Sequence, residues 1–129
     1  MCRLFAGADP ALWEKETHSL RLHGTSTSLC LEAFFWRVLD EIALRDGLTL
    51  NGLITRLYDE LLAQERDMVN FTSFLRVCCG RYLALQAQGE IPSARDVPIR
   101  GLDAGAILAR EQRRFSGTRP LPVPQASRG

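Results

Sequence analysis

Small polar side chains recur at every second position of one short segment. In Thr25–Leu31, the residues Ser26, Ser28 and Cys30 alternate with threonine and leucine. Successive side chains of a β-strand point to opposite faces, so the alternation predicts a strand with one polar face and one apolar face. Hydroxyl and thiol groups can touch the edges of nucleic-acid bases, but they lack the paired donors that select one base. The polar face is therefore a candidate surface for permissive base contacts.

A strand of this kind needs a partner. Its N–H and C=O groups are unpaired along both edges, and even an isolated two-stranded hairpin is marginal in water. The favoured partner is the same segment of a second chain, paired antiparallel. A two-stranded ribbon with its polar side chains turned outward fits the major groove of B-DNA. The strand thus predicts an intertwined homodimer that binds double-stranded DNA.

The preceding segment, His18–His23, alternates as well. Leu20 and Leu22 lie on one face, and Arg21 lies on the other. Gly24 breaks the parity between the two apolar sets and must supply a turn or a bulge. An intrachain hairpin and a longer bent ribbon both satisfy this pattern. Two interpretations of Arg21 stay open: it reaches a phosphate beside the ribbon, or it only solvates an edge strand, as charged residues do.

Three amphipathic helices must position the strand. The first covers residues 32–46 and is closed by Gly47 in a left-handed C-cap. Thr49 caps the second, which runs to about residue 65, and the third covers roughly residues 70–86. The predicted fold class is mainly α with one or two short β-strands. The predicted dimer core consists of Leu29, Leu31, Phe35, Leu39, Leu53 and Leu57.

The ends of the chain have different compositions. Residues 1–16 read as an N-terminal arm, with a helix start at Pro10, whose apolar side chains cover part of the core. Residues 17–86 form the domain. Residues 87–129 are rich in Pro, Gly, Ser and Arg, which predicts a mostly disordered basic tail. One exception is a short helix over residues 103–115 with Asp103 as its N-cap.

Charge and cysteine content restrict the function classes. The segments 1–16, 17–65, 66–86 and 87–129 carry net charges of −1, −3, +2 and +3, so basic charge lies behind the core. This distribution is a poor footprint for nucleic-acid binding, which depends on phosphate neutralisation. Four cysteines without a CxxC pair match neither a disulfide scaffold nor a zinc site. Without a signal-like or membrane-spanning run, we expect a cytoplasmic protein.

Other reactive side chains do not assemble a catalytic pattern. His18, His23 and Cys30 have no spacing that enforces a metal site. Cys78 and Cys79 are adjacent and diverge on a helix, which is typical of packing residues. No nucleophile is paired with a base in the sequence. We therefore predict a protein that is not an enzyme and that uses no metal or cofactor.

Two segments carry a resemblance to a known family. Ser19-Leu-Arg-Leu-His-Gly-Thr-Ser-Thr-Ser-Leu-Cys-Leu-Glu-Ala-Phe-Phe-Trp36, followed by Gly47-Leu-Thr-Leu-Asn51, resembles the ribbon-helix-helix family of MetJ and Arc-type repressors. More closely, these segments look like a bacterial subfamily of uncharacterised ribbon-helix-helix domain proteins. That subfamily continues into a third helix like residues 70–76, and some members open much like residues 1–7. The resemblance covers about residues 1–86.

The resemblance implies roles for individual residues. It places Ser26, Ser28 and Cys30 on base edges, and the backbone N–H groups near Thr49, Leu50 and Asn51 on a phosphate. The second role agrees with the partial positive charge and free donors of a helix N-terminus. Related strands often carry Arg, Lys, Asn or Gln outward, and the position that is commonly Arg is Cys30 in this chain.

Two functions follow, and they differ in partner. The leading hypothesis is a homodimeric DNA-binding regulator of transcription that reads the major groove with its ribbon. The alternative is a dimeric, antitoxin-like interaction module of the same fold, with weak or no DNA binding, which holds a partner protein through its third helix or tail. A helix-turn-helix monomer would use the two central helices but would leave the Thr25–Leu31 strand without a mate.

Overall fold

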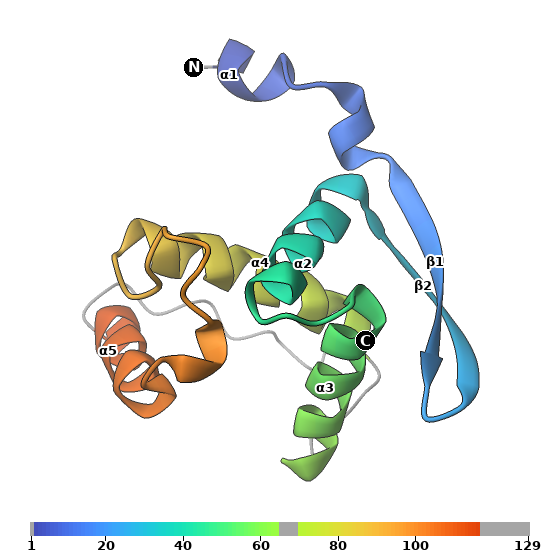
Figure 1. Cartoon of the computed structure of the whole chain (residues 1–129). Coiled ribbons are helices and arrows are strands. Elements are labelled where there is room, and N and C mark those ends of the chain that lie inside the picture. Colours follow the sequence, from blue (N-terminus) through green and yellow to red (C-terminus); the bar gives the residue numbers. More distant parts are fainter. Residues whose placement is uncertain (1, 65–69, 117–129) are drawn as a thin grey trace, which may run out of the picture.

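The computed structural model describes residues 2–64 and 70–116 (Figure 1). A two-stranded sheet leads into a bundle of helices, and a short arm precedes the sheet. In chain order the elements are α1 (Cys2–Ala6), η1 (Pro10–Trp13), β1 (Lys15–Leu22), β2 (Thr25–Glu32), α2 (Ala33–Arg45), α3 (Leu50–Ala63), α4 (Phe71–Ala87), η2 (Ile99–Gly101) and α5 (Ala104–Ser116). The prediction of a mainly helical fold with a two-stranded sheet is confirmed.

The two strands form a hairpin within one chain. They pair antiparallel in a register that runs from Leu22 opposite Thr25 to Lys15 opposite Glu32. The connecting residues His23 and Gly24 have φ angles of 54° and 80°. Positive φ at both central residues is what a type I′ turn requires. The hairpin therefore supplies, within one chain, the pairing partner that the strand was expected to find in a second copy. Pairing with a second chain stays a prediction.

The predicted helices begin and end close to where the sequence places them. Gly47 follows α2 with a φ of 68°, which confirms the left-handed C-cap. The Thr49 side chain accepts a hydrogen bond from the Gly52 N–H at 3.0 Å, which confirms the N-cap of α3. This helix ends at Ala63, close to the predicted end near residue 65. Asn70 precedes α4, as expected.

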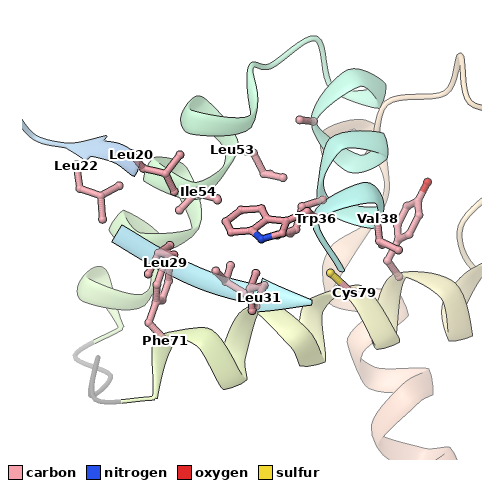
Figure 2. Close-up of a cluster of buried hydrophobic side chains, with 14 of the residues drawn as sticks. Leu20, Leu22, Leu29, Leu31, Trp36, Val38, Leu53, Ile54, Phe71 and Cys79 are labelled. Atoms are coloured by element: carbon pink, nitrogen blue, oxygen red, sulfur yellow. The ribbon is translucent and has the colours of Figure 1, made fainter. Parts of the chain in front are cut away.

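One apolar cluster lies between the hairpin and the helices. Trp36 is 2% exposed, and its indole N–H donates to the Glu16 carbonyl of β1 at 2.8 Å. Leu31, Leu39 and Ile54 are fully buried beside it. Figure 2 shows side chains from both strands and from α2, α3 and α4 gathered in this cluster. The apolar face of the hairpin is thus the floor of the core.

The expected disorder after residue 87 is wrong for residues 88–116. Ile91 and Ile107 are 6% and 8% exposed and belong to the core cluster. The Asp103 carboxylate caps α5 by accepting a hydrogen bond from the Ala106 N–H at 3.1 Å. The short helix predicted over residues 103–115 is therefore confirmed. Composition misled the prediction because the segment is held by two buried isoleucines and by hydrogen bonds from Arg45, and composition reveals neither kind of contact. The remaining predicted tail, residues 117–129, lies outside the described residues.

The N-terminal arm covers less of the core than predicted: η1 contacts α2 and its Leu12 is half-buried, but α1 is exposed. Asp9 caps η1 with Pro10 at its first position, which confirms the helix start. However, neither α1 nor η1 contains a buried residue. Leu4, Phe5 and Trp13 are 77%, 68% and 55% exposed. Figure 1 shows α1 standing apart from the helical bundle, beyond the open end of the hairpin.

Candidate functional site

The polar face of the hairpin is exposed along its length. Ser26, Ser28 and Cys30 are all exposed on β2, as the alternation predicts. The strand register places Arg21, Ser19 and Thr17 of β1 directly opposite them, and these residues are exposed as well. With Lys15 at the start of β1, the face presents seven exposed side chains in two rows: four hydroxyls, one thiol, one guanidinium and one ammonium.

The site includes one strong link between β1 and α3. The Asn51 amide accepts from the Arg21 N–H and donates to the Arg21 carbonyl, each at 2.8 Å. A side-chain amide thus replaces the next strand at this point of the edge. The link holds the start of α3 against the hairpin and also closes the outer edge of β1 near the turn.

The start of α3 retains donors for an anion. Thr49 uses its hydroxyl on Gly52, and Asn51 uses its amide on the hairpin, so neither side chain is available. The first backbone N–H groups of a helix have no intrahelical acceptor. Within the described residues, no hydrogen bond engages the N–H groups of Leu50 and Asn51. These two backbone amides lie close to Arg21, because the Asn51 side chain is hydrogen-bonded to the Arg21 backbone.

The turn of the hairpin is tied to α3 by a second polar contact. The His23 ring nitrogen lies 2.5 Å from the Asp59 carboxylate, and both side chains are about half exposed. Arg21 donates weakly to the Gly24 carbonyl at 3.5 Å within the same turn. Asp59 is eight residues after Asn51 on α3, so the His23–Asp59 contact holds the tip of the hairpin against a later turn of the same helix.

The residues of the predicted dimer core have places inside the single chain. Leu29, Leu31, Leu39 and Leu53 are buried in the core cluster, and Phe35 and Leu57 are partly buried against it. They pack the hairpin on α2 and α3 without a second copy. Contact with a partner chain stays a prediction.

The histidine and cysteine residues considered for metal or redox chemistry pack against other side chains. His18 stacks on Trp36 with ring centroids 3.9 Å apart. In the part of the chain that the structure describes, no three His, Cys, Asp or Glu side chains form a group able to hold a metal ion. Burial raises the pKa of the Cys78 thiol to about 11 and that of Cys79 to about 12, so both are protonated near neutral pH.

Sequence reasoning missed two parts of this surface. Thr17 and Ser19 share the polar face with Cys30 and Ser28, and the two-residue turn at Gly24 would have fixed that register had the hairpin been chosen. The role of Asn51 as a hairpin anchor has no local signal in the sequence, since its partner Arg21 lies 30 residues earlier.

None of the helices in residues 2–64 and 70–116 is long and apolar enough to cross a membrane.

Comparison with known proteins places this geometry in a family. The chain matches no curated protein. It is similar to the solved structure of an uncharacterized protein from Bordetella pertussis Tohama I, with 51% sequence identity and a TM-score of 0.83. That match covers 95% of this chain and 98% of the other. The model of the ribbon-helix-helix domain matches residues 15–83, from the first strand to the third helix of the bundle. The chain therefore belongs to the ribbon-helix-helix domain family.

Proposed function

We propose that the protein is a homodimeric DNA-binding regulator of transcription in which each chain inserts its own hairpin into the major groove. The observation that carries the proposal is the exposed polar face of the hairpin beside the start of α3. Ser26, Ser28 and Cys30 face the base edges. Arg21 and the backbone amides of Leu50 and Asn51 bind phosphates at the rim of the groove.

Groove width favours one hairpin over a ribbon shared between chains. The major groove is about 12 Å wide, and neighbouring strands lie about 4.8 Å apart. A hairpin is one such spacing across. If β2 paired instead with its copy through its open edge, β1 would remain attached on each side. The resulting four-stranded sheet would measure about 14 Å between its outer strands and would not enter the groove.

The polar face predicts weak discrimination between sequences. Serine and threonine hydroxyls contact any base, and a thiol has no donor pair for guanine. Affinity must then come from roughly 4 to 6 phosphate contacts per dimer, which gives a slope of log K against log salt of about −4 to −5. Binding is expected at low salt and should fall steeply as salt is raised.

A fluorescence-anisotropy titration on duplex DNA at several salt concentrations tests the proposal. Cys30→Arg places a donor fork in the groove and is expected to tighten binding, with about 1 to 3 kcal/mol of added preference for guanine per good contact. Ser28→Glu places a carboxylate in the groove and is expected to weaken binding strongly. Gln112→Glu adds the same charge on an exposed position of α5 and is the matched control.

Equal behaviour of the wild type, Cys30→Arg and Ser28→Glu would contradict the proposal, as would a lack of binding near ~50 mM salt. A loss in Gln112→Glu as large as that in Ser28→Glu would show that net charge, and not the hairpin face, governs affinity.

A lack of binding, or equal behaviour of the three proteins, would favour the alternative function, a dimeric, antitoxin-like module that holds a partner protein. The specific observation in its favour is the scarcity of cations on the hairpin face, where Lys15 and Arg21, near opposite ends of β1, are the two basic side chains among seven exposed ones. A DNA-binding surface usually gathers several basic side chains on one side.

A further inference from the structure

An apolar pocket lies where α3, α4 and α5 meet, and it has a volume of about 340 Å³. Its lining combines Leu53 and Leu57 of α3 and Leu85 of α4 with Ile107 and Leu108 of α5. In Figure 1 the orange segment, which also contributes to the lining, leads from the end of α4 into α5. Pockets of roughly 300 to 1,000 Å³ with mainly apolar linings are the usual binding sites of small molecules. This pocket is therefore large enough for a small ligand.

Four lining residues carry polar groups, and three of them are paired or uncharged. Arg81 forms an ion pair with Glu111 at 2.6 Å, and the Tyr82 hydroxyl donates to a carboxylate of α2 at 2.6 Å. The Cys78 thiol is neutral, because burial raises its pKa to about 11. The fourth residue is Glu60, whose carboxylate has no hydrogen bond or ion pair with any described residue. All lining residues lie within the described ranges, so the uncompensated charge of the pocket is a single negative one.

Glu60 and Leu108 mark the mouth of the pocket. Leu108 is 51% exposed and Glu60 is exposed as well, whereas Leu53 and Ile107 are 5% and 8% exposed. Arg56, one turn before Glu60 on α3, forms no ion pair with it, so the carboxylate is available. A ligand can thus bury an apolar part between the helices and keep a charged group in water at the mouth, which avoids the cost of burying a charge.

We infer that this pocket binds a compact apolar amine. One water occupies about 30 Å³ in the liquid, so the pocket has room for roughly ten groups of that size. The ammonium group lies at the mouth beside Glu60, and the same carboxylate repels an acid of equal length. Because residues 91–108 form part of the lining, a bound amine stabilises their attachment to α3 and α4. The site is separate from the hairpin, and the inference does not depend on DNA binding.

Isothermal titration calorimetry of the full chain with octylamine, octan-1-ol and octanoate tests the inference. The three probes share a chain of eight carbons and differ in the charge of the head group. Octylamine is expected to bind one site per chain with a dissociation constant of about 1 mM or below, since each buried methylene adds affinity. Octan-1-ol should bind about two- to fivefold more weakly, because an ion pair at an exposed rim contributes little, and octanoate more weakly still.

Two pairs of variants locate the site. Ala104 lines the pocket at the start of α5, so Ala104→Phe is expected to weaken octylamine binding at least about tenfold. Ala109→Phe, at an exposed position of the same helix outside the pocket, is the matched control and should bind as the wild type does. Glu60→Gln should lower the affinity for octylamine to that for octan-1-ol, whereas Glu14→Gln should keep the preference. All four positions are exposed, so circular dichroism should show folded variants.

Several results would overturn the inference. One is a lack of binding of both octylamine and octan-1-ol at millimolar concentration. Another is octylamine binding that Ala104→Phe leaves intact or that Ala109→Phe weakens equally, because the amine would then bind elsewhere on the surface. A preference for octanoate, or a preference for octylamine that survives Glu60→Gln, would contradict the amine class.

Hydrogen exchange gives an independent location of the bound probe. Octylamine should slow amide exchange in α5 and leave exchange in the hairpin unchanged, because binding stabilises the segment that lines the pocket. Slower exchange in the hairpin without any change in α5 would place the probe outside this pocket and contradict the inference.

Discussion

The hairpin and the C-terminal segment 88–116 are both folded, yet they are held in different ways. The hairpin rests on alternation within 18 residues, from Lys15 to Glu32, and on a two-residue turn. The C-terminal segment is held by side chains far away in sequence. Arg45, 5% exposed at the end of α2, donates to the carbonyls of Val97, Ala94 and Pro92, between 47 and 52 residues later. Local pattern specifies the first region, and long-range polar contacts specify the second.

Further contacts extend this difference. The Asp46 carboxylate accepts from the Ile99 N–H at 2.6 Å, and Arg100 donates to the Asp46 carbonyl. On α5, Arg110 donates to Glu90 at 2.6 Å. Most of these partners are backbone groups, which any residue could supply. Residues 92–99 are therefore held largely through their backbone groups, and the amino-acid composition of the segment does not reveal these contacts.

Deletion of residues 90–129 should show the largest effect. It removes the buried side chains of Ile91 and Ile107 and leaves Arg45 without its carbonyl acceptors. We expect a loss of at least about 4 kcal/mol, equivalent to a drop of about 10 °C or more in the thermal midpoint. Deletion of residues 117–129 is the control, because it removes none of these contacts. An unchanged midpoint after the longer deletion would restore the sequence-based view that the whole tail contributes little stability.

Arg45→Met should cause the next largest loss of stability. Methionine fills much of the same volume, but it leaves the carbonyls of Pro92, Ala94 and Val97 without their donor and removes the 3.3 Å hydrogen bond to the Tyr82 hydroxyl. The expected loss is about 3 kcal/mol in urea unfolding. Arg37→Met, at an exposed position of the same helix, should cost less than about 0.5 kcal/mol. Equal stability of the two variants would mean that the clamp on residues 92–97 is not what holds the segment.

These two regions also explain what the sequence could predict. The strand at Ser26–Cys30, the cap at Thr49 and the turn at Gly24 each follow from periodicity or turn chemistry over a few residues. The choice between an intrachain hairpin and a shared ribbon was not readable, because both satisfy the same alternation. The Arg45 clamp was not readable either, since an arginine at the end of an amphipathic helix normally faces solvent.

Asn51→Ala probes the hairpin side of the comparison. The change removes two hydrogen bonds to the Arg21 backbone and reopens that point of the β1 edge. We expect a loss of about 1 to 2 kcal/mol and faster hydrogen exchange of the Arg21 amide. Asn70→Ala is the matched control, because the Asn70 side chain makes no capping hydrogen bond at the start of α4. If Asn70→Ala speeds exchange at Arg21 to the same extent, Asn51 is not the anchor.

The smallest effect is expected at the junction of β2 and α4, and it depends on pH. Arg76 donates to the Glu32 carboxylate at 2.9 Å, and this hydrogen bond holds the pKa of Glu32 below its ordinary value of 4.5. A carboxyl whose pKa is lowered by folding adds stability above its unfolded-state pKa, and that stability is lost as the pH falls through the folded-state pKa. Arg76→Met should therefore be less stable than the wild type near neutral pH, by less than about 1 kcal/mol for a partly exposed pair. The difference in stability should shrink as the pH falls below 4.5.

Urea unfolding of both proteins from pH 7 to pH 3 measures this difference. Glu32→Gln should show the same reduced acid dependence. A difference that stays constant to pH 3 would mean that the Arg76 side chain contributes through packing instead of through its charge.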